Sequence, residues 1–219
     1  TINEVGDLLM KYDLYISHSH VGAIRHCLAG CERATMDSIE KVYSIEPALG
    51  QCEHYLKAHG FAQCKAANTA VAAKQVHDWD DPTFAAVCSE DAAKLYGLKI
   101  LEAGINDDCT NQTRFVAISR TLSAEPADNR VSVAFTLPHT RGTLAATLSM
   151  FSAYNVNLTE IHSRPLPQTP WEYRFYVDVE GCLSSDSVRA LIYQLSEELS
   201  SLRLLGSYQI TQTQEEANL

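Results

Sequence analysis

Residues 130–137 read RVSVAFTL, and the alternation of apolar and polar side chains is typical of a strand with one buried face. A helix is expected to begin at Gly142, because apolar residues recur at helical spacing over residues 144–151. Two further strands are predicted at residues 157–161 and 171–179, where aromatic and β-branched side chains are frequent.

The last two elements complete this pattern. Ser185 and Asp186 are suited to cap a helix whose apolar positions repeat over residues 188–199. Residues 202–210 supply a final strand. The order βαββαβ predicts an antiparallel sheet with both helices on one face, a ferredoxin-like arrangement. Four strands and two helices bury a small core, so pairing with a second copy is expected.

Composition and charge narrow the class of protein. The chain has 219 residues, 46% of them hydrophobic and 20% charged, which is ordinary for a globular protein. The formal charge of −10 argues against a nucleic-acid binder, which needs a basic surface. No apolar run is long enough to span a membrane, and residues 1–15 do not resemble a secretion leader.

Cysteine and histidine positions give little support for a metal site. Seven scattered cysteines without a C-x-x-C pair argue against a disulfide framework or a zinc site, so a reducing cytoplasm is the expected location. His18 and His20 share one face of a predicted strand, and His26 follows. A packed or solvated histidine face is favoured over a metal site there, because no fourth ligand is evident.

Residues 123–129, SAEPADN, are small and polar and are interpreted as a linker. Before this linker helices and strands alternate, which predicts an α/β domain with a parallel sheet. The expected strands are 14–17, 42–44, 84–88 and 115–118, and the expected helices are 47–57, 70–77 and 90–96.

Particular motifs then identify a family. Residues 111–115, NQTRF, resemble the N-x-T-R-F motif of prephenate dehydratases. Residues 43–52 resemble that family's Y-S-H-P-x-A-L-x-Q-C segment, and residues 89–98 resemble its S-E-x-A-x-x-L-Y-G-L segment. Residues 26–28 match its H-C-L motif. The C-terminal part resembles the ACT domain of these enzymes: residues 141–144 match the glycine loop, 161–165 the E-S-R-P segment, and 171–173 follow at the familiar distance.

The resemblance implies an α/β protein with three parts. Residues 1–122 correspond to a periplasmic-binding-protein-like dehydratase domain, 123–129 to the linker and 130–212 to an ACT regulatory domain. Family members begin with about 75–100 further residues, a large share of one domain lobe, so the dehydratase domain is expected to be partial here. Ile45 and Glu46 stand in place of the S-H-P histidine, and His162 replaces the first glutamate of E-S-R-P.

The implied reaction converts prephenate to phenylpyruvate, with loss of carbon dioxide and the ring hydroxyl, and needs no cofactor or metal. The resemblance assigns Thr113 the role of assisting the departing hydroxide; alternatively, Thr113 satisfies backbone groups at a strand entry. Arg114 either binds a substrate carboxylate or forms a structural ion pair, because adjacent strand residues face opposite sides.

Three more residues are candidates for the catalytic cleft. Ser44 and Gln51 lie around the start of one expected helix, and Thr69 lies at the start of the next. Helix N-termini are natural seats for carboxylates, so these residues are predicted to hold substrate. The structural alternative for Ser44 and Thr69 is plain helix capping.

In ACT domains of this family, the glycine loop of one chain and the S-R-P segment of its dimer mate enclose phenylalanine. Carried over by position, the effector-binding residues are Gly142, Thr143, Leu144, His162, Ser163, Arg164 and Pro165. The expected partners are therefore prephenate, L-phenylalanine as effector, and a second copy in a homodimer or homotetramer. Two hypotheses stay open: a dehydratase inhibited by phenylalanine, or an inactive chain that only binds phenylalanine.

Overall fold

The computed structural model describes residues 4–108, 110–166, 169 and 171–212, so Cys109 lies outside the described residues. Contacts divide the chain into two compact units, each considered by itself. The terminal unit joins the segment up to Gly22 with the segment from Arg114 onward, and the inserted unit comprises Ala23–Thr113. Within the described residues, no helix is both long and apolar enough to cross a membrane.

The terminal unit is built on a six-stranded sheet in the order β7-β1-β11-β8-β10-β9. The four strands β11, β8, β10 and β9 are mutually antiparallel, whereas β1 runs parallel to β11. The elements are α1 (Glu4–Tyr12), β1 (Tyr15–Ala23), β7 (Gln112–Ser119), β8 (Arg130–Pro138), α6 (Thr143–Ala153), β9 (Leu158–Pro165), β10 (Glu172–Glu180), α7 (Asp186–Glu198) and β11 (Leu202–Gln212).

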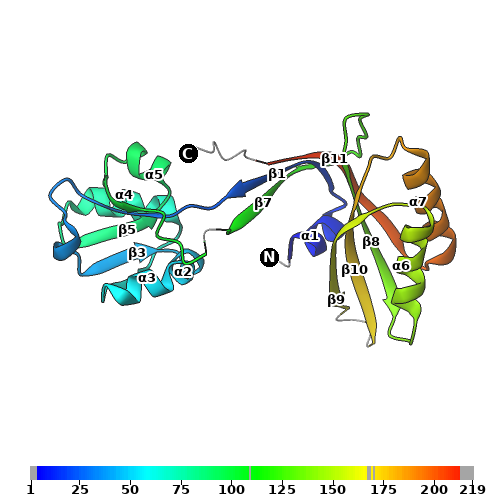
Figure 1. Ribbon diagram of the computed structural model, residues 1–219, viewed down its shortest axis with the longest axis horizontal. Helices are drawn as coiled ribbons and strands as arrows, with labels where there is room; N and C mark the ends of the chain where they lie inside the picture. The colour runs from blue at the N-terminus through cyan, green and yellow to red at the C-terminus, as the bar shows by residue number, and fades with distance from the viewer. Residues whose placement is uncertain (1–3, 109, 167–168, 170, 213–219) are drawn as a thin grey trace. The chain divides into compact units, whose positions relative to one another are not determined.

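Helices cover both faces of this sheet (Figure 1). Helices α6 and α7 pack on one face over a large apolar core, to which β8 contributes Val131, Val133 and Phe135. Helix α1 covers the other face, where Leu9 and Tyr208 belong to a smaller cluster. The strand expected at residues 130–137 is present: its odd positions face α6 and α7, and its even positions face the side of α1. The expectation of a single buried face was wrong, because Ser132 and Ala134 on the even face are also buried.

The order of elements predicted for residues 130–210 is the order in the structure, with small differences at the ends. Ser185 caps α7 by accepting the Val188 N–H, as expected. Gly142 stands before α6 with φ of +85°, a left-handed conformation that glycine adopts without strain.

Segments from both sides of the predicted linker share this unit. Strand β1 pairs with β11 through His18–Val21, and β7 lies at the edge beyond β1. Residues 4–22 and 114–122 thus pack with the C-terminal elements, although the sequence groups them with the dehydratase domain. The functional boundaries at residues 122 and 130 stay a prediction, because packing and family membership divide a chain by different criteria.

The inserted unit contains a five-stranded sheet in the order β4-β3-β5-β2-β6. Its elements are β2 (Cys27–Gly30), the 3-10 helix η1 (Met36–Ser38), β3 (Lys41–Ser44), α2 (Glu46–Gly50), α3 (Glu53–Ala58), β4 (Ala62–Lys65), α4 (Thr69–Trp79), β5 (Phe84–Cys88), α5 (Glu90–Leu95) and β6 (Lys99–Ala103).

Both faces of the inserted sheet are buried. Leu28, Val42 and Val87 pack toward α2 and α3 on one face, and Ala29 and Ala86 pack toward α4 and α5 on the other (Figure 1). Strands covered on both sides are continuously apolar, as the sequence FAAVC of β5 is.

Two expectations for the inserted unit were wrong. The sheet is mixed, not parallel: β3 runs parallel to β4 and β5, but β2 runs antiparallel to β5 and β6. The helix expected at 47–57 is two short helices, because Cys52 leaves the helical region with φ of −122° and ψ of 21°. The resulting corner at Gln51 and Cys52 forms one wall of the candidate site.

Candidate functional site

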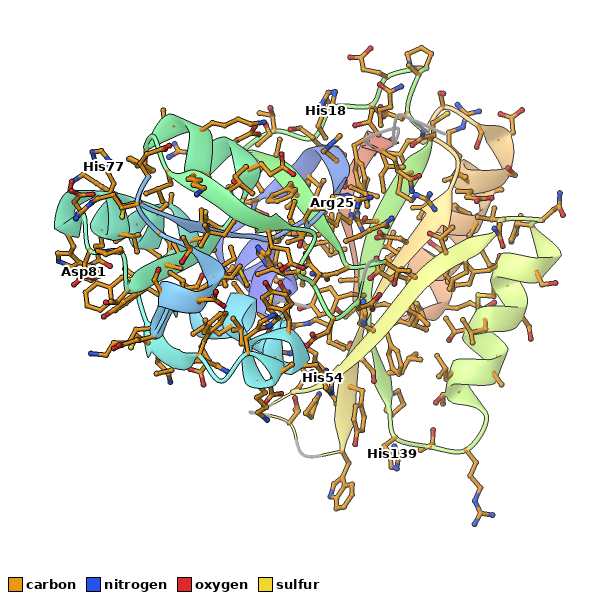
Figure 2. The ribbon with its side chains drawn as sticks, turned by 60° about the vertical axis from the view of Figure 1, so that its left-hand side comes forward. His18, Arg25, His54, His77, Asp81 and His139 are labelled. Atoms are coloured by element: carbon orange, nitrogen blue, oxygen red, sulfur yellow. The ribbon has the colours of Figure 1, made fainter. Side chains whose placement is uncertain are left out.

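A cavity of about 340 Å³ opens in the inserted unit beside the corner between α2 and α3. The corner contributes Gln51 and His54, and the segment that follows β6 contributes Asp107 and Asn111. The complete lining is Gly50, Gln51, Glu53, His54, Asp107, Asp108 and Asn111. Figure 2 marks His54 near the start of α3. Segments some fifty residues apart therefore meet at one polar cavity.

Gln51 is held in place by a buried histidine. Its Oε1 lies 2.8 Å from His26 Nε2, and His26 is only 7% exposed. Because the amide oxygen accepts, Nε2 is the donor in this hydrogen bond. Among the described residues His26 Nδ1 has no hydrogen-bond partner, although it is buried.

The segment that carries His26 is joined to the segment that carries Asn111. The Ile24 N–H donates to the Asn111 carbonyl at 3.0 Å, and the His26 N–H donates to Asn106 Oδ1 at 2.6 Å. The Asn111 Nδ2 is itself buried and finds no partner within the described part of the chain. Buried polar atoms are usually paired, and Asn111 lines the cavity, so its unpaired amide donor marks a place where a bound molecule can complete the hydrogen bonding.

Carboxylates give the mouth of the cavity a negative charge. Asp107 accepts from the backbone N–H groups of His54 and Tyr55 and lies 3.2 Å from His54 Nδ1. Burial acts to raise the pKa of Asp107, but these N–H groups and His54 outweigh it, so the pKa lies below its usual value. Asp107 is therefore ionised at neutral pH and fixes the start of α3. An anionic ligand must bind away from this carboxylate.

Thr113 is the second residue of β7 and is half-buried. It lies two positions after Asn111, a spacing that places side chains on the same side of an extended segment. Among the described residues, no hydrogen bond to its hydroxyl is present, so the hydroxyl is available to a ligand. The catalytic role of Thr113 stays a prediction.

Arg114 takes part in a structural ion-pair cluster of the terminal unit, which is the structural alternative raised from the sequence. Its guanidinium donates to Ser19 Oγ at 2.9 Å, to Glu160 Oε2 at 2.9 Å, to Asp178 and to the Tyr208 hydroxyl. Burial opposes the charge, but the neighbouring Asp178, Tyr208 and Glu160 outweigh it and keep the pKa of Arg114 raised. A guanidinium shared by two carboxylates has little capacity left for a substrate carboxylate, which favours the structural alternative for Arg114 over substrate binding.

Neither Ser44 nor Thr69 is a helix cap, and the expected role of Thr69 in substrate binding stays a prediction. Ser44 is fully buried, and its hydroxyl donates to the Val87 carbonyl at 2.7 Å, so it ties β3 to β5. It does not cap α2, whose N-cap is Ile45. Thr69 is the first helical residue of α4, and Asn68 is the cap through its bond to the Val71 N–H. Of the residues predicted for catalysis, Gln51 lines the cavity; His26 and Asn111 were overlooked, although both stand in the quoted motifs.

The residues predicted for effector binding divide between the two faces of the terminal sheet. Ser163 and Pro165 pair in register with Phe175 and Tyr173, which face α6 and α7. His162 and Arg164 project to the side of α1, where His162 Nε2 lies 2.5 Å from Glu160 Oε1 and Arg164 Nε lies 3.2 Å from Asp7 Oδ2. One pocket can use only one of these pairs, because successive strand residues face opposite sides.

The glycine loop lies at the same end of the sheet as Pro165. In the register of β10, Tyr173 is opposite Leu137 on one side and Pro165 on the other. The hydroxyl of Thr143 donates to the carbonyls of Pro138 and Thr140 and thereby fixes the loop, while Leu144 packs at the edge of the core. Leu137 and Pro165 are thus two strand spacings apart, roughly 10 Å, and the glycine loop follows β8 directly at this end of the sheet.

A second cavity in the terminal unit, of about 480 Å³, lies elsewhere. It is lined by Leu148, Phe151, Ser152, Asn155, Val156, Asn157 and Leu158. These residues belong to the end of α6 and the start of β9, the strand end opposite Pro165. The sequence did not suggest this cavity, and none of the residues predicted for effector binding line it.

Comparison with known proteins gives a consistent result. The family model described as prephenate dehydratase matches residues 1–123. The arogenate dehydratase/prephenate dehydratase 2 of Arabidopsis thaliana is 36% identical, over 94% of this chain and 57% of its own length. The prephenate dehydratase of Methanocaldococcus jannaschii is 33% identical, over 93% of this chain and 75% of its own. The chain thus spans little more than half of the plant relatives it matches.

Solved structures share the fold. The prephenate dehydratase of Arthrobacter aurescens in complex with L-Phe has a TM-score of 0.78 and 28% identity, covering 90% of this chain and 66% of that one. GqqA, described as a novel type of quorum quenching acylase, has a TM-score of 0.82 and 27% identity, covering 96% and 77%. The mixed α/β architecture is therefore the one found in these proteins.

Proposed function

The chain belongs to the prephenate dehydratase family, and on that premise we propose that it converts prephenate to phenylpyruvate in L-phenylalanine biosynthesis. The observation that carries this proposal is the cavity beside Gln51, into whose lining the N-x-T-R-F segment brings Asn111, two residues before the free hydroxyl of Thr113. Relatives named as prephenate or arogenate dehydratases over most of this chain support the same reaction.

The reaction needs positioning more than strong acid or base chemistry. The bond from the ring to its carboxylate breaks and releases carbon dioxide, and the electron pair moves into the ring. The bond from the opposite ring carbon to the hydroxyl oxygen then breaks, and the hydroxide takes a proton and leaves as water. Because the ring becomes aromatic, the driving force is already in the substrate. The protein has to orient the leaving groups and stabilise the developing charge.

Three side chains of the inserted unit are suited to these tasks. The Thr113 hydroxyl donates a hydrogen bond to the departing oxygen, which is the charge-accepting atom. The Asn111 Nδ2, buried and without a partner among the described residues, donates to a substrate oxygen. Gln51, oriented by His26, presents its free amide N–H groups on the cavity wall. Asp107 repels carboxylates and thereby limits the orientations in which an anionic substrate can enter.

Substitution of Thr113 tests this assignment. Thr113→Ala is expected to lower turnover of prephenate by about 10²–10⁴-fold, the usual contribution of a positioned proton donor. Thr113→Ser keeps the hydroxyl and should retain most activity, and Thr121→Ala serves as the matched control in the same segment. Equal activity of Thr113→Ala and the native chain would remove Thr113 from the reaction. Arogenate is assayed in parallel, because three of the plant relatives carry both names.

We further propose that the terminal unit is an ACT module that binds L-phenylalanine and inhibits turnover. In this assignment the carboxylate of the amino acid binds the free N–H groups at the start of α6, where Gly142 allows close approach. Ser163 and Pro165 of β9 are the S-R-P residues on the α6 face and complete the site with Thr143 and Leu144, from the same chain or from a second copy. The L-Phe complex of the Arthrobacter aurescens relative supports this choice of ligand.

Regulation is a difference in ligand affinity between two arrangements of the chain. Calorimetry with L-phenylalanine tests the binding, and Gly142→Ala is expected to weaken it. A Cβ at position 142 meets no other atom within 4 Å, so any loss arises from backbone conformation and not from a clash. Absence of heat at millimolar phenylalanine would remove the regulatory proposal.

The second hypothesis is that this chain binds phenylalanine without turning over prephenate. The L-Phe complex of the Arthrobacter aurescens relative supports its binding part. Phenylpyruvate formation by the native chain, lost in Thr113→Ala, decides against it. Phenylalanine binding without any turnover decides for it.

A further inference from the structure

Two cysteines of the inserted unit face each other across neighbouring strands. Cys27 begins β2 and Cys88 ends β5, and the two are direct partners in the antiparallel register. Directly opposed residues of an antiparallel pair point to the same face, with Cα atoms about 4.5–5.5 Å apart. A disulfide spans Cα atoms about 4.4–6.8 Å apart, so the backbone already has the required spacing.

The two thiols also interact. A hydrogen bond between the side chains lowers the pKa of Cys27 and raises that of Cys88, so the proton is held on Cys88. Both side chains have zero exposure and belong to the apolar cluster beneath α4 and α5, with Ala73 and Ala93. Both are free thiols in the structure. Polar partners other than each other are scarce in such surroundings, which favours their mutual pairing.

We propose that Cys27 and Cys88 form an oxidation site that closes to an intramolecular disulfide. In the step, the Cys27 thiolate attacks one sulfur of a small disulfide such as oxidised glutathione and releases one glutathione thiolate. The Cys88 thiol loses its proton to solvent, attacks Cys27 Sγ in the mixed disulfide, and releases the second glutathione. Two protein thiols are oxidised and one glutathione disulfide is reduced to two thiols, so atoms and electrons balance.

From the position of the pair we expect oxidation to be slow but selective. Full burial means that an oxidant reaches Cys27 only when the strand ends open, and strand ends are where local opening starts. Once the mixed disulfide forms, the register places Cys88 ahead of the other cysteines as the resolving thiol. Cys27 also follows His26 directly, so the bridge would lie one residue from the hydrogen bond that orients Gln51.

Mass spectrometry tests the proposal on the full chain. Native protein, and protein refolded from urea after full reduction, are equilibrated with oxidised glutathione; free thiols are then blocked and the chain is digested without reductant. We expect a peptide pair joined through Cys27 and Cys88, which dithiothreitol separates. Cys88→Ser should abolish the pair, whereas Cys31→Ser, a buried cysteine just beyond β2, should retain it.

Three outcomes are informative. The bridged peptide in either sample supports the site, because equilibrium does not depend on the route by which the thiols become accessible. Its absence from both samples, with Cys27 and Cys88 blocked or carrying glutathione, overturns the proposal. A bridge from Cys27 to another cysteine overturns it as well. None of these results depends on dehydratase activity. The disulfide proposal is therefore tested independently of the proposed function.

Discussion

Neutralising Asp178 should destabilise the terminal unit more than neutralising Glu160, the other carboxylate bound to Arg114. Asp178 is 8% exposed and receives hydrogen bonds from Ser132, Arg114 and Tyr208. In Asp178→Asn the amide can still accept from Ser132 through its oxygen, but its NH₂ group then faces the guanidinium of Arg114. Two donors would meet where one charge-assisted pair existed.

The expected loss of stability in Asp178→Asn follows from the burial of this ion pair. Removing one partner of a buried ion pair costs about 3–5 kcal/mol. The Arg114 side chain is 26% exposed and keeps Glu160 at 2.9 Å, so part of the charge stays compensated. We therefore expect about 2–4 kcal/mol for Asp178→Asn. Glu160→Gln is the matched control, because it also removes one carboxylate from Arg114, but at a side chain that is 42% exposed. Surface pairs contribute about 0–1 kcal/mol.

Urea unfolding followed by circular dichroism measures both variants. A loss in the expected range corresponds to a fall in Tm of roughly 4–16 °C, since a chain of this size loses about 2–4 °C for each kcal/mol. The reasoning is refuted if Asp178→Asn costs no more than Glu160→Gln. Catalytic constants separate the roles of Arg114: a structural cluster predicts that Asp178→Asn lowers stability while KM for prephenate is unchanged well below the melting temperature.

Three further changes test other parts of the structure. The pKa of Asp107 is lower in the folded state, so the stability that its carboxylate contributes to the fold is complete above the unfolded pKa of about 3.9 and is lost as pH falls through the folded value. The free energy of unfolding of Asp107→Asn should therefore converge on that of the native chain as pH falls from about 5 toward 2, measured by a series of urea titrations. Asn68→Ala should cost about 1 kcal/mol in the same assay, whereas Thr69→Ala should cost clearly less, and the reverse order would restore Thr69 as the cap of α4. His162→Glu places a second carboxylate beside Glu160 and should lower the Tm, while His162→Gln should change it little; equal Tm values would show that the His162–Glu160 contact is unimportant.

The sequence predicted those features of the fold that depend on local pattern. The alternation in residues 130–137, the cap at Ser185 and the continuous apolar run FAAVC each determine a local conformation, and all three are present. Strand β2 was missed because CLAG is short and carries no alternation. The corner at Cys52 was missed because an apolar helical pattern continues through it, and only the tertiary contact of Asp107 with the His54 and Tyr55 N–H groups fixes the new helix start.

The candidate site was predictable to the extent that it lies in one motif. The N-x-T-R-F segment indicated Thr113 as a candidate. It could not predict the ion-pair partners of Arg114, because Glu160 and Asp178 lie 46 and 64 residues further along the chain. Similarly, the sequence could place Gln51 on a helix but could not show that His26 would orient it. Residue type and spacing predict a candidate function, whereas the partner that confirms or cancels it is set by long-range packing.

Strand β1 shows most clearly what a local pattern leaves open. Alternation over residues 14–17 indicates which face of a strand is buried, but the same pattern fits either sheet of this protein. The partner of β1 proves to be β11, about 190 residues away in the chain. One sequence feature did carry information about it: Gly206 interrupts an otherwise apolar strand, and a glycine there indicates close approach of another backbone. A Cβ at position 206 would lie 2.3 Å from the Ile16 carbonyl oxygen, so β1 can reach this site only because residue 206 has no side chain.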